Sequence, residues 1–241
     1  MTSERLTAPP ARTRRRPPRG LSAGLPLALG SVLFAAVAVM VGSGSGLALL
    51  DPGLHQWLVD ARTPAATTVL EAITTVSSPT WLTVIGIGFA AIWALVRREV
   101  WRPGLLMAAM ASTVAVSWTI KHLLARSRPP TPQMLMGPDD AYSFPSGHTF
   151  GATVFLLVLA YLMLSRRSTA WRRRALAAAA VVLIPLVALS RVYLGYHWPT
   201  DVLASVFLGT AMLGVVVLVD ARRPRWTRVS FPSRSHSSQA R

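Results

Sequence analysis

Residues 202–219 read VLASVFLGTAMLGVVVLV, a run of apolar and small residues that holds no acidic or basic side chain. Four further runs of this kind lie at 81–96, 104–120, 149–164 and 175–190. Each is slightly shorter than the ~20 residues that cross a bilayer, and a helix can extend into its flanks. An apolar run at 25–50 precedes them and weakens near Gly42–Gly46. The pattern predicts an all-α fold, a polytopic membrane helical bundle with six transmembrane helices.

The composition agrees with a membrane protein and excludes several other classes. Of the 241 residues, 52% are hydrophobic and only 14% charged, whereas a soluble domain is about 25% charged. The absence of cysteine excludes disulfides, Cys-ligated zinc and iron–sulfur clusters. A net charge of +16 in a soluble protein would suggest nucleic acid, but the placement of the charges gives a better explanation, and we expect no nucleic-acid partner.

The basic residues predict the orientation of the helices. Twenty of the 25 Lys and Arg residues lie in four segments, 1–24, 97–103, 165–174 and 220–241, which all fall on one side of a six-helix topology. Because cytoplasmic loops are enriched in Lys and Arg, we place both termini in the cytoplasm of a cell with a plasma or inner membrane. The other five basic residues then lie on the extracytoplasmic face.

This topology divides the chain into three parts. Residues 1–24 are read as a disordered basic cytoplasmic tail, 25–219 as the six-helix membrane domain, and 220–241 as a second basic tail. Within the domain, the mixed stretch 51–79 predicts short helices at the membrane interface. A basic segment before an apolar run also describes a signal peptide. The run is longer than a usual signal core and no clear cleavage site follows it, so we expect the first helix to be retained.

Lys121 and Arg128 belong to a first group of polar residues on the predicted outer face. They are seven residues apart, nearly two helical turns, so they could share one helix face before Pro129 ends the helix. Taken alone, the pair is also explained by two cations that reach out of the membrane from a helix end.

The segment Pro145-Ser146-Gly147-His148 forms a second group, at the start of an apolar run. Ser146 or Gly147 suits the N-cap position of a helix. Free backbone N–H groups at such an end bind anions, and His148 would lie beside the bound anion. The alternative is an ordinary helix cap followed by an incidental histidine.

The third group runs from Ser190-Arg191 to His197-Trp-Pro-Thr-Asp201, between the fifth and sixth apolar runs. Asp201 lies in the predicted first turn of the last helix, close enough to reach back to His197. A carboxylate on one imidazole nitrogen fixes the tautomer and leaves the other nitrogen free to attack. The pair could instead serve only to cap the helix.

Considered together, the three groups predict a phosphoryl-transfer site. All of them fall on the same outer face, and they supply cations, a helix N-terminus, two histidines and one carboxylate. Phosphoryl transfer depends on positioning and on stabilisation of negative charge, which these cations could supply without a metal. We read Asp139 and Asp140 as solvated loop residues rather than metal ligands, and we expect no metal and no cofactor.

The order Lys-x6-Arg-Pro, Pro-Ser-Gly-His and Ser-Arg-x5-His-x3-Asp resembles the type 2 phosphatidic acid phosphatase family. Its superfamily also includes vanadium haloperoxidases and bacterial acid phosphatases. All eleven motif positions match, within 121–201, and the resemblance covers roughly 51–219. It implies a haloperoxidase-like helical core.

The resemblance also implies roles for these residues. His197 looks like the nucleophile that forms a phosphohistidine intermediate, Asp201 like its orienting partner, and His148 like the general acid and then base. The residues that look like phosphate ligands are Lys121, Arg128, Ser146, Gly147 and Arg191. Activity in the family is independent of magnesium. His122 is not a motif position, and we read it as structural or interfacial.

The leading hypothesis is an integral membrane lipid phosphatase that acts on the outer face of the membrane. An undecaprenyl-type diphosphate is the first candidate substrate, and phosphatidic acid or phosphatidylglycerol phosphate is the alternative. Two remote alternatives are a vanadium-dependent haloperoxidase, which bromide oxidation would reveal, and a non-catalytic lipid-phosphate binding or transport protein. A lost motif residue would indicate the latter, and none is lost.

Overall fold

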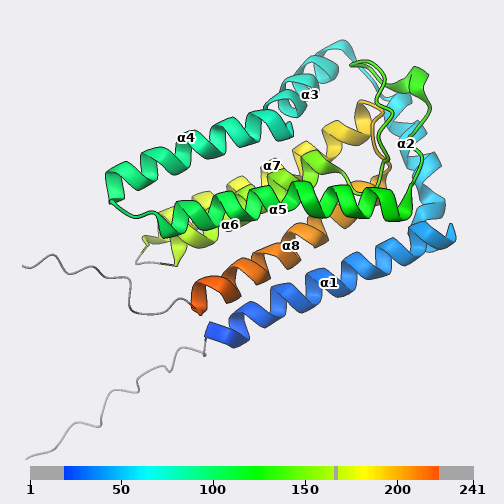
Figure 1. The fold of residues 1–241 in the computed structure, drawn as a ribbon. Coiled ribbons are helices and arrows are strands. Elements are labelled where there is room, and N and C mark those ends of the chain that lie inside the picture. Colours follow the sequence, from blue (N-terminus) through cyan, green and yellow to red (C-terminus); the bar gives the residue numbers. More distant parts are fainter. Residues whose placement is uncertain (1–18, 166–167, 223–241) are drawn as a thin grey trace, which may run out of the picture.

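The computed structural model describes residues 19–165 and 168–222, and the regular elements of this part of the chain are all helices (Figure 1). The predicted all-α class is thereby confirmed. The helices are α1 (Arg19–Ser43), α2 (Asp51–Asp60), α3 (Pro64–Val76), α4 (Pro79–Arg97), α5 (Trp101–Leu124), α6 (Gly147–Leu164), α7 (Ala170–Tyr193) and α8 (Pro199–Ala221), with short 3₁₀ turns at Gly46–Leu50 and Thr131–Gln133.

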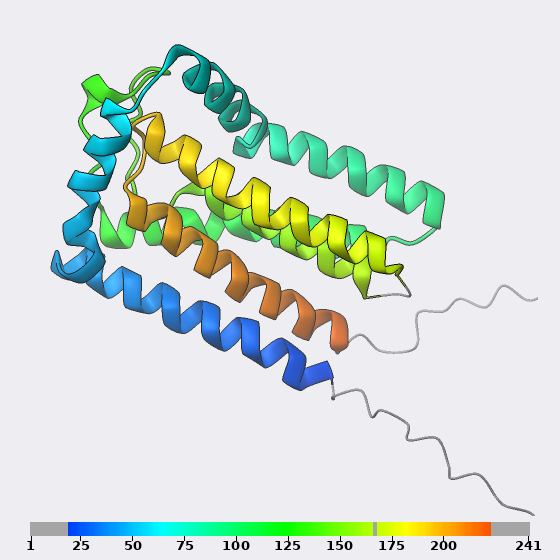
Figure 2. The ribbon, with the colours of Figure 1, turned by 180° about the vertical axis from the view of Figure 1, so that it is seen from behind.

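Six of these helices, α1 and α4 to α8, are long and apolar enough to cross a membrane, which confirms the predicted number of spans. They run side by side through the bundle (Figures 1 and 2). The short helices α2 and α3 form the predicted mixed stretch and lie together at one end. The start of α1 and the end of α8 lie at the opposite end.

Helix α1 differs from its predicted bounds at both ends. It begins at Arg19, so residues 19–24, expected in the disordered tail, are helical. A helix near a membrane keeps its backbone groups paired by extending beyond the apolar run. It ends at Ser43, where Gly44 adopts a positive φ of 61°, as the glycine-rich segment predicted. The remainder of both expected tails, 1–18 and 223–241, lies outside the described residues.

Helices α1 and α8 pack closely because two glycines remove side chains from their interface. A Cβ on Gly214 would lie 2.5 Å from the backbone nitrogen of Leu27, and one on Gly30 would overlap the backbone of Ala211. Small residues allow membrane helices to approach in this way, and dispersion contacts then hold them together.

Helix α6 lies at the centre of the bundle, against α5, α7 and α8. Its residues Phe150, Val154, Val158 and Leu162 are four positions apart and have no exposed surface. They therefore form one continuous buried stripe along the helix. This packing fixes where the first turn of α6 lies, and that turn carries Ser146, Gly147 and His148.

Candidate active site

The three predicted groups of polar residues meet at the end of the bundle that carries α2 and α3. His148 interacts electrostatically with His197, Arg191, Arg128 and Lys121, which come from four other segments of the chain. The structure therefore brings the two histidines and the three cations into one site, as the shared outer face predicted.

The first group reaches this site by a different route from the predicted one. Helix α5 ends at Leu124, because Ala125 takes a left-handed conformation with φ 44° and its N–H closes the helix on the carbonyl of Lys121, at 2.9 Å. Arg128 therefore lies in the following loop and not on the helix face of Lys121. The prediction of a shared helix face was wrong, because the helix ends at Leu124, five residues before Pro129.

Arg128 is held by the loops around it. Its Nε donates to the carbonyl of Ala141 at 2.6 Å, and its Nη1 donates to the carbonyl of Tyr196 at 2.7 Å. The same Nη1 lies 3.4 Å from Nε2 of His197. These contacts place a fixed positive charge on the Nε2 side of the imidazole. Lys121 donates to the carbonyl of Tyr142 in the same loop.

Asp139, expected to be solvated, has a side chain that is 36% exposed but that also forms an ion pair. Its Oδ2 lies 2.7 Å from Nη2 of Arg128, and the Arg128 side chain is only 8% exposed. The loop folds back so that a carboxylate meets the guanidinium, which sequence separation alone could not show. Asp140, the next residue, is exposed as expected.

Helix α6 begins as predicted, with Ser146 at the N-cap. The Ser146 hydroxyl accepts from the backbone N–H of Thr149 at 3.5 Å and from its hydroxyl at 3.1 Å. The N–H groups of Gly147 and His148 belong to the first turn, which has no intrahelical acceptors for them. The positive end of the helix therefore faces the site and suits a phosphate.

Arg191 lies in the last turn of α7 and is 5% exposed. Its Nη1 donates to the hydroxyl of Thr74 at 2.7 Å, and its guanidinium carbon lies 4.3 Å from the ring centroid of Tyr196. Among the described residues, its Nε has no hydrogen-bond partner. A buried guanidinium with an unused donor is suited to an anionic ligand.

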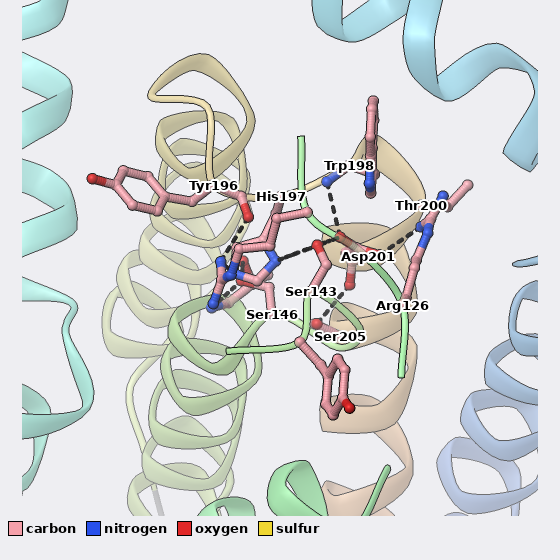
Figure 3. A network of polar contacts seen from close by, with 12 residues as sticks. Arg126, Ser143, Ser146, Tyr196, His197, Trp198, Thr200, Asp201 and Ser205 are labelled. Carbon is pink, nitrogen blue, oxygen red and sulfur yellow. Dashed lines mark hydrogen bonds and ion pairs between the residues drawn. The ribbon is translucent and has the colours of Figure 1, made fainter. Parts of the chain in front are cut away.

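His197 lies in the turn between α7 and α8 and is 2% exposed. The turn depends on Gly195, whose φ is +91° and whose Cα lies too close to the carbonyl of Gln133 for a side chain. Nδ1 of His197 lies 3.5 Å from Oδ2 of Asp201 and 3.4 Å from Oγ of Ser143 (Figure 3). The predicted reach of Asp201 to His197 therefore agrees with the geometry.

Burial of the imidazole, together with the positive charges of Arg128, Arg191 and Lys121, holds the pKa of His197 well below its ordinary value of 6.5. The ring is therefore neutral at physiological pH. Because Nδ1 faces the carboxylate, Nε2 carries the lone pair when Nδ1 carries the proton, and Nη1 of Arg128 lies 3.4 Å from it as a hydrogen-bond donor.

Sequence reasoning missed four residues that hold Asp201 in place. Ser143 donates to its Oδ2, and Arg126 pairs with its Oδ1 at 2.6 Å. Asp51 and Thr200 complete the group through Arg126. None of the four belongs to a motif. Arg126 was, however, one of the five basic residues predicted on the side of the membrane where basic residues are disfavoured, and this position could have marked it as a functional residue.

His122, read as structural or interfacial, makes contacts of that kind. Its Nδ1 lies 2.8 Å from the carbonyl of Trp118, and its ring packs against the rings of Trp118 and Tyr142.

A groove of about 240 Å³ leads from the site between α4, α5 and α6. Its walls are mostly apolar, with Leu82 and Met110 buried in them, and Lys121 and Gly147 also line it. Val114 and Trp118, both 63% exposed, lie on its rim. The groove thus connects the end of the bundle that carries the candidate site with the apolar outer surface of the helices.

Comparisons with known proteins agree with this arrangement. Residues 102–225 match the PAP2 superfamily. The chain is 34% identical over 136 residues, 51% of its length, to the putative undecaprenyl-diphosphatase YbjG of Escherichia coli, and the match spans 63% of that protein. It is 33% identical over 60% of its length to the decaprenylphosphoryl-5-phosphoribose phosphatase of Mycobacterium tuberculosis, covering 74% of that protein.

The fold matches that of a solved membrane enzyme. The crystal structure of a transmembrane PAP2-type phosphatidylglycerolphosphate phosphatase from Bacillus subtilis superposes with a TM-score of 0.69 at 25% identity, over 86% of this chain and 98% of that one. The chain belongs to the PAP2 superfamily, as one of its multi-pass membrane phosphatases. This conclusion rests on the motif-bearing helices, the six spans, and the matches to the family, the relatives and the solved structure.

Proposed function

We propose that this protein is a lipid phosphatase that removes the terminal phosphate of an undecaprenyl-type diphosphate at the outer face of the cell membrane. The observation that carries the proposal is the apolar groove that ends beside Lys121 and Gly147. A lipid can keep its chain in such a groove while its phosphate lies among the cations of the site. A site built for a soluble phosphate ester would not need this path.

In the proposed first step, Nε2 of His197 attacks the terminal phosphorus, and the bond between that phosphorus and the bridging oxygen breaks. His148 donates a proton to the departing oxygen, so the lipid leaves as its monophosphate. Nδ1–H of His197 remains directed at Asp201, which stabilises the positive charge on the ring. The product of this step is a phosphohistidine on the enzyme.

In the second step, His148 takes a proton from a water molecule that attacks the phosphorus. The bond between Nε2 and phosphorus breaks, inorganic phosphate is released and the imidazole of His197 returns to its neutral form. The histidine that was the acid in the first step is the base in the second, as microscopic reversibility requires.

The cations stabilise the equatorial oxygens of the phosphoryl group during both steps. Lys121, Arg128 and Arg191 approach the site from α5, the following loop and α7, and the first turn of α6 adds Gly147 N–H and the Ser146 cap. These donors carry the role that metal ions have in many phosphoryl-transfer enzymes, so we propose activity without added metal.

The charge distribution supports the proposed orientation. The site lies at the end of the bundle away from the start of α1 and the end of α8 (Figure 1). Arg97, Arg98 and Arg172–Arg174 lie at the end that carries the start of α1 and the end of α8. By the positive-inside rule, this distribution supports the proposal that that end lies in the cytoplasm and the site outside.

Relatives named for both undecaprenyl diphosphate and phosphatidylglycerophosphate leave one substrate alternative. The two matches to polyprenyl-phosphate phosphatases exceed 30% identity, which favours a polyprenyl substrate. The extent of the fold match to the Bacillus subtilis enzyme favours phosphatidylglycerol phosphate as the second candidate.

The test is phosphate release by the detergent-purified protein in the presence of EDTA. Undecaprenyl diphosphate, phosphatidylglycerol phosphate, phosphatidic acid and a short-chain soluble ester would be compared, with His197→Ala beside each. We expect metal-free turnover, the highest kcat/KM for undecaprenyl diphosphate, and no turnover by the variant. A higher kcat/KM for the soluble ester than for every lipid would refute the proposal.

A further inference from the structure

The carboxylate of Asp201 lies in a polar network that extends beyond the motif residues (Figure 3). Its Oδ1 pairs with Nη1 of Arg126 at 2.6 Å, and its Oδ2 accepts from the backbone N–H of Trp198 at 2.9 Å and from the hydroxyl of Ser143. Asp201 has no exposed surface. Its position relative to His197 is thus set by several donors, of which Arg126 is the one that carries charge.

Arg126 is shared between two carboxylates. Its Nη2 lies 2.6 Å from Oδ2 of Asp51, the first residue of α2, which is 1% exposed. Asp51 in turn accepts from the backbone N–H of Thr200 at 2.9 Å and from its hydroxyl at 2.5 Å. The hydroxyl of Thr200 also accepts from Arg126 at 2.8 Å. The network therefore joins the start of α2 to the first turn of α8.

The charges of this network sum to one negative charge on the Nδ1 side of His197. Arg126 alone would neutralise the negative charge of Asp201, but Asp51 also pairs with Arg126 and offsets part of its positive charge. Two buried carboxylates without the guanidinium would be costly to keep ionised. When the guanidinium of Arg126 is present, a net negative charge remains beside Nδ1 of His197. This charge stabilises the imidazole, which becomes positive when its Nε2 bonds to phosphorus.

We infer that Arg126 and Asp51 are positioning residues for the reaction: Arg126 keeps the Asp201 carboxylate ionised and directed at Nδ1 of His197, and Asp51 offsets part of the charge of Arg126 so that Asp201 keeps a net negative charge beside the imidazole. The inference rests on the proposed function. The side-chain contacts of Arg126 are with the two carboxylates, Thr200 and, at 5.7 Å, the ring of Trp198, and its carbonyl accepts from the backbone N–H of Ser143 at 2.8 Å. It acts through Asp201 and does not contact the phosphate site.

This role predicts a specific split between the kinetic constants. Replacing a residue that orients a catalytic partner typically lowers activity ~10- to 100-fold, and loss of the orienting carboxylate itself gives an upper limit of ~10⁴-fold. We expect Arg126→Met to lower kcat about 100-fold and Asp51→Asn about 10-fold. KM should stay within about threefold for both, because the phosphate ligands are intact. Arg126→Lys should recover part of the loss.

The pH profile separates this role from a merely structural one. The charged or titratable groups that face His197 are Asp201 from α8, Lys121 from α5, His148 from α6, Arg191 from α7 and Arg128 from the loop. Removing the negative charge of Asp51 makes these surroundings more positive, so protonation of His197 becomes harder. The acidic limb of kcat/KM should therefore move to lower pH in Asp51→Asn. If Asp51 had only a structural role, its replacement would leave the acidic limb of kcat/KM at the same pH.

The experiment compares wild type, Arg126→Met, Arg126→Lys and Asp51→Asn in full-length protein, with Asp60→Asn as the control. Asp60 is exposed at the other end of α2, so its change removes the same charge without touching the network. Activities are normalised to the folded fraction, judged by gel filtration and thermal unfolding. If Arg126→Met does not fold, the near-isosteric Asp51→Asn and Arg126→Lys decide the question.

A kcat that falls at constant KM, with a shifted acidic limb in Asp51→Asn, supports the inference. Wild-type kcat in the network variants, or a loss confined to KM or to the folded fraction, overturns it while the proposed function stands. Wild-type protein without turnover on any phospholipid or polyprenyl diphosphate is a different result: it overturns the proposed function and this inference with it.

Discussion

Filling the apolar groove should impair the reaction with lipids and spare the reaction with soluble esters. The suitable position is Gly151, which lines the groove on α6 one turn beyond Gly147. A Cβ on Gly151 would lie 3.6 Å from Cδ1 of Leu82, an ordinary contact distance. Gly151→Phe is thus compatible with the backbone, while its ring must project into the groove of about 240 Å³ between α4 and α5.

The expected loss comes from displacement of the phosphate and not from lost hydrophobic burial. A lipid chain leaves one apolar environment for another when it enters the groove, so little hydrophobic free energy is gained there. A chain that cannot enter holds its phosphate away from His197, and a displacement of 1 Å at a reacting centre costs ~100-fold. We therefore expect kcat/KM for a polyprenyl diphosphate to fall about 100-fold, equivalent to about 2.7 kcal/mol.

The assay is phosphate release from undecaprenyl diphosphate and from a short-chain soluble ester, measured side by side. The ester should keep its kcat/KM within about threefold, because Lys121, Arg128 and Arg191 are unchanged. Gly88→Phe is the matched control, since Gly88 lies on α4 with open space around its Cα and does not line the groove. Equal losses for both substrates, or no loss for the lipid, would refute the role of the groove.

Three further outcomes follow from the site. Asp201→Asn should lower kcat by ~10³- to 10⁴-fold with KM nearly unchanged, because the ring loses its charged partner; a kcat within tenfold of wild type in a steady-state assay contradicts this. Burial and neighbouring cations hold the pKa of His197 below 6.5, so wild-type kcat/KM should fall on acidification only below pH 6.5. An acidic limb centred above pH 7 in a pH–rate profile would argue against His197 as the nucleophile. Asp139→Asn frees Arg128 from a competing carboxylate, so inhibition by inorganic phosphate or vanadate should become several-fold tighter, and an unchanged inhibition constant shows that the ion pair does not compete with the anion.

Local patterns in the sequence predicted the spans and the identity of the motif residues. Six uncharged runs are sufficient to predict six helices because no water is available in the bilayer to satisfy an unpaired backbone. Ser146 could be placed at a helix start because it precedes an apolar run. Asp201 could be placed near His197 because it lies four positions later, in the first turn of the helix that follows the histidine.

Contacts between distant segments could not be predicted in this way. Arg126 and Asp51 are 75 residues apart, and the register of α2 against α8 depends on side-chain packing that no periodicity reports. The ion pair between Arg128 and Asp139 depends on the path of a loop. The end of α5 was placed too late because the conformation of Ala125, and not the prolines that follow, ends the helix.

The central claim is that His197 carries the phosphoryl group during turnover. The direct measurement is a rapid-quench reaction with a substrate labelled in its terminal phosphate, stopped in alkali because phosphohistidine is labile in acid, followed by peptide mapping. The account predicts label on His197 in wild type, longer-lived label when His148→Ala slows attack by water, and none in His197→Ala. Turnover in wild type with no label on His197, or with label on another residue, would contradict it.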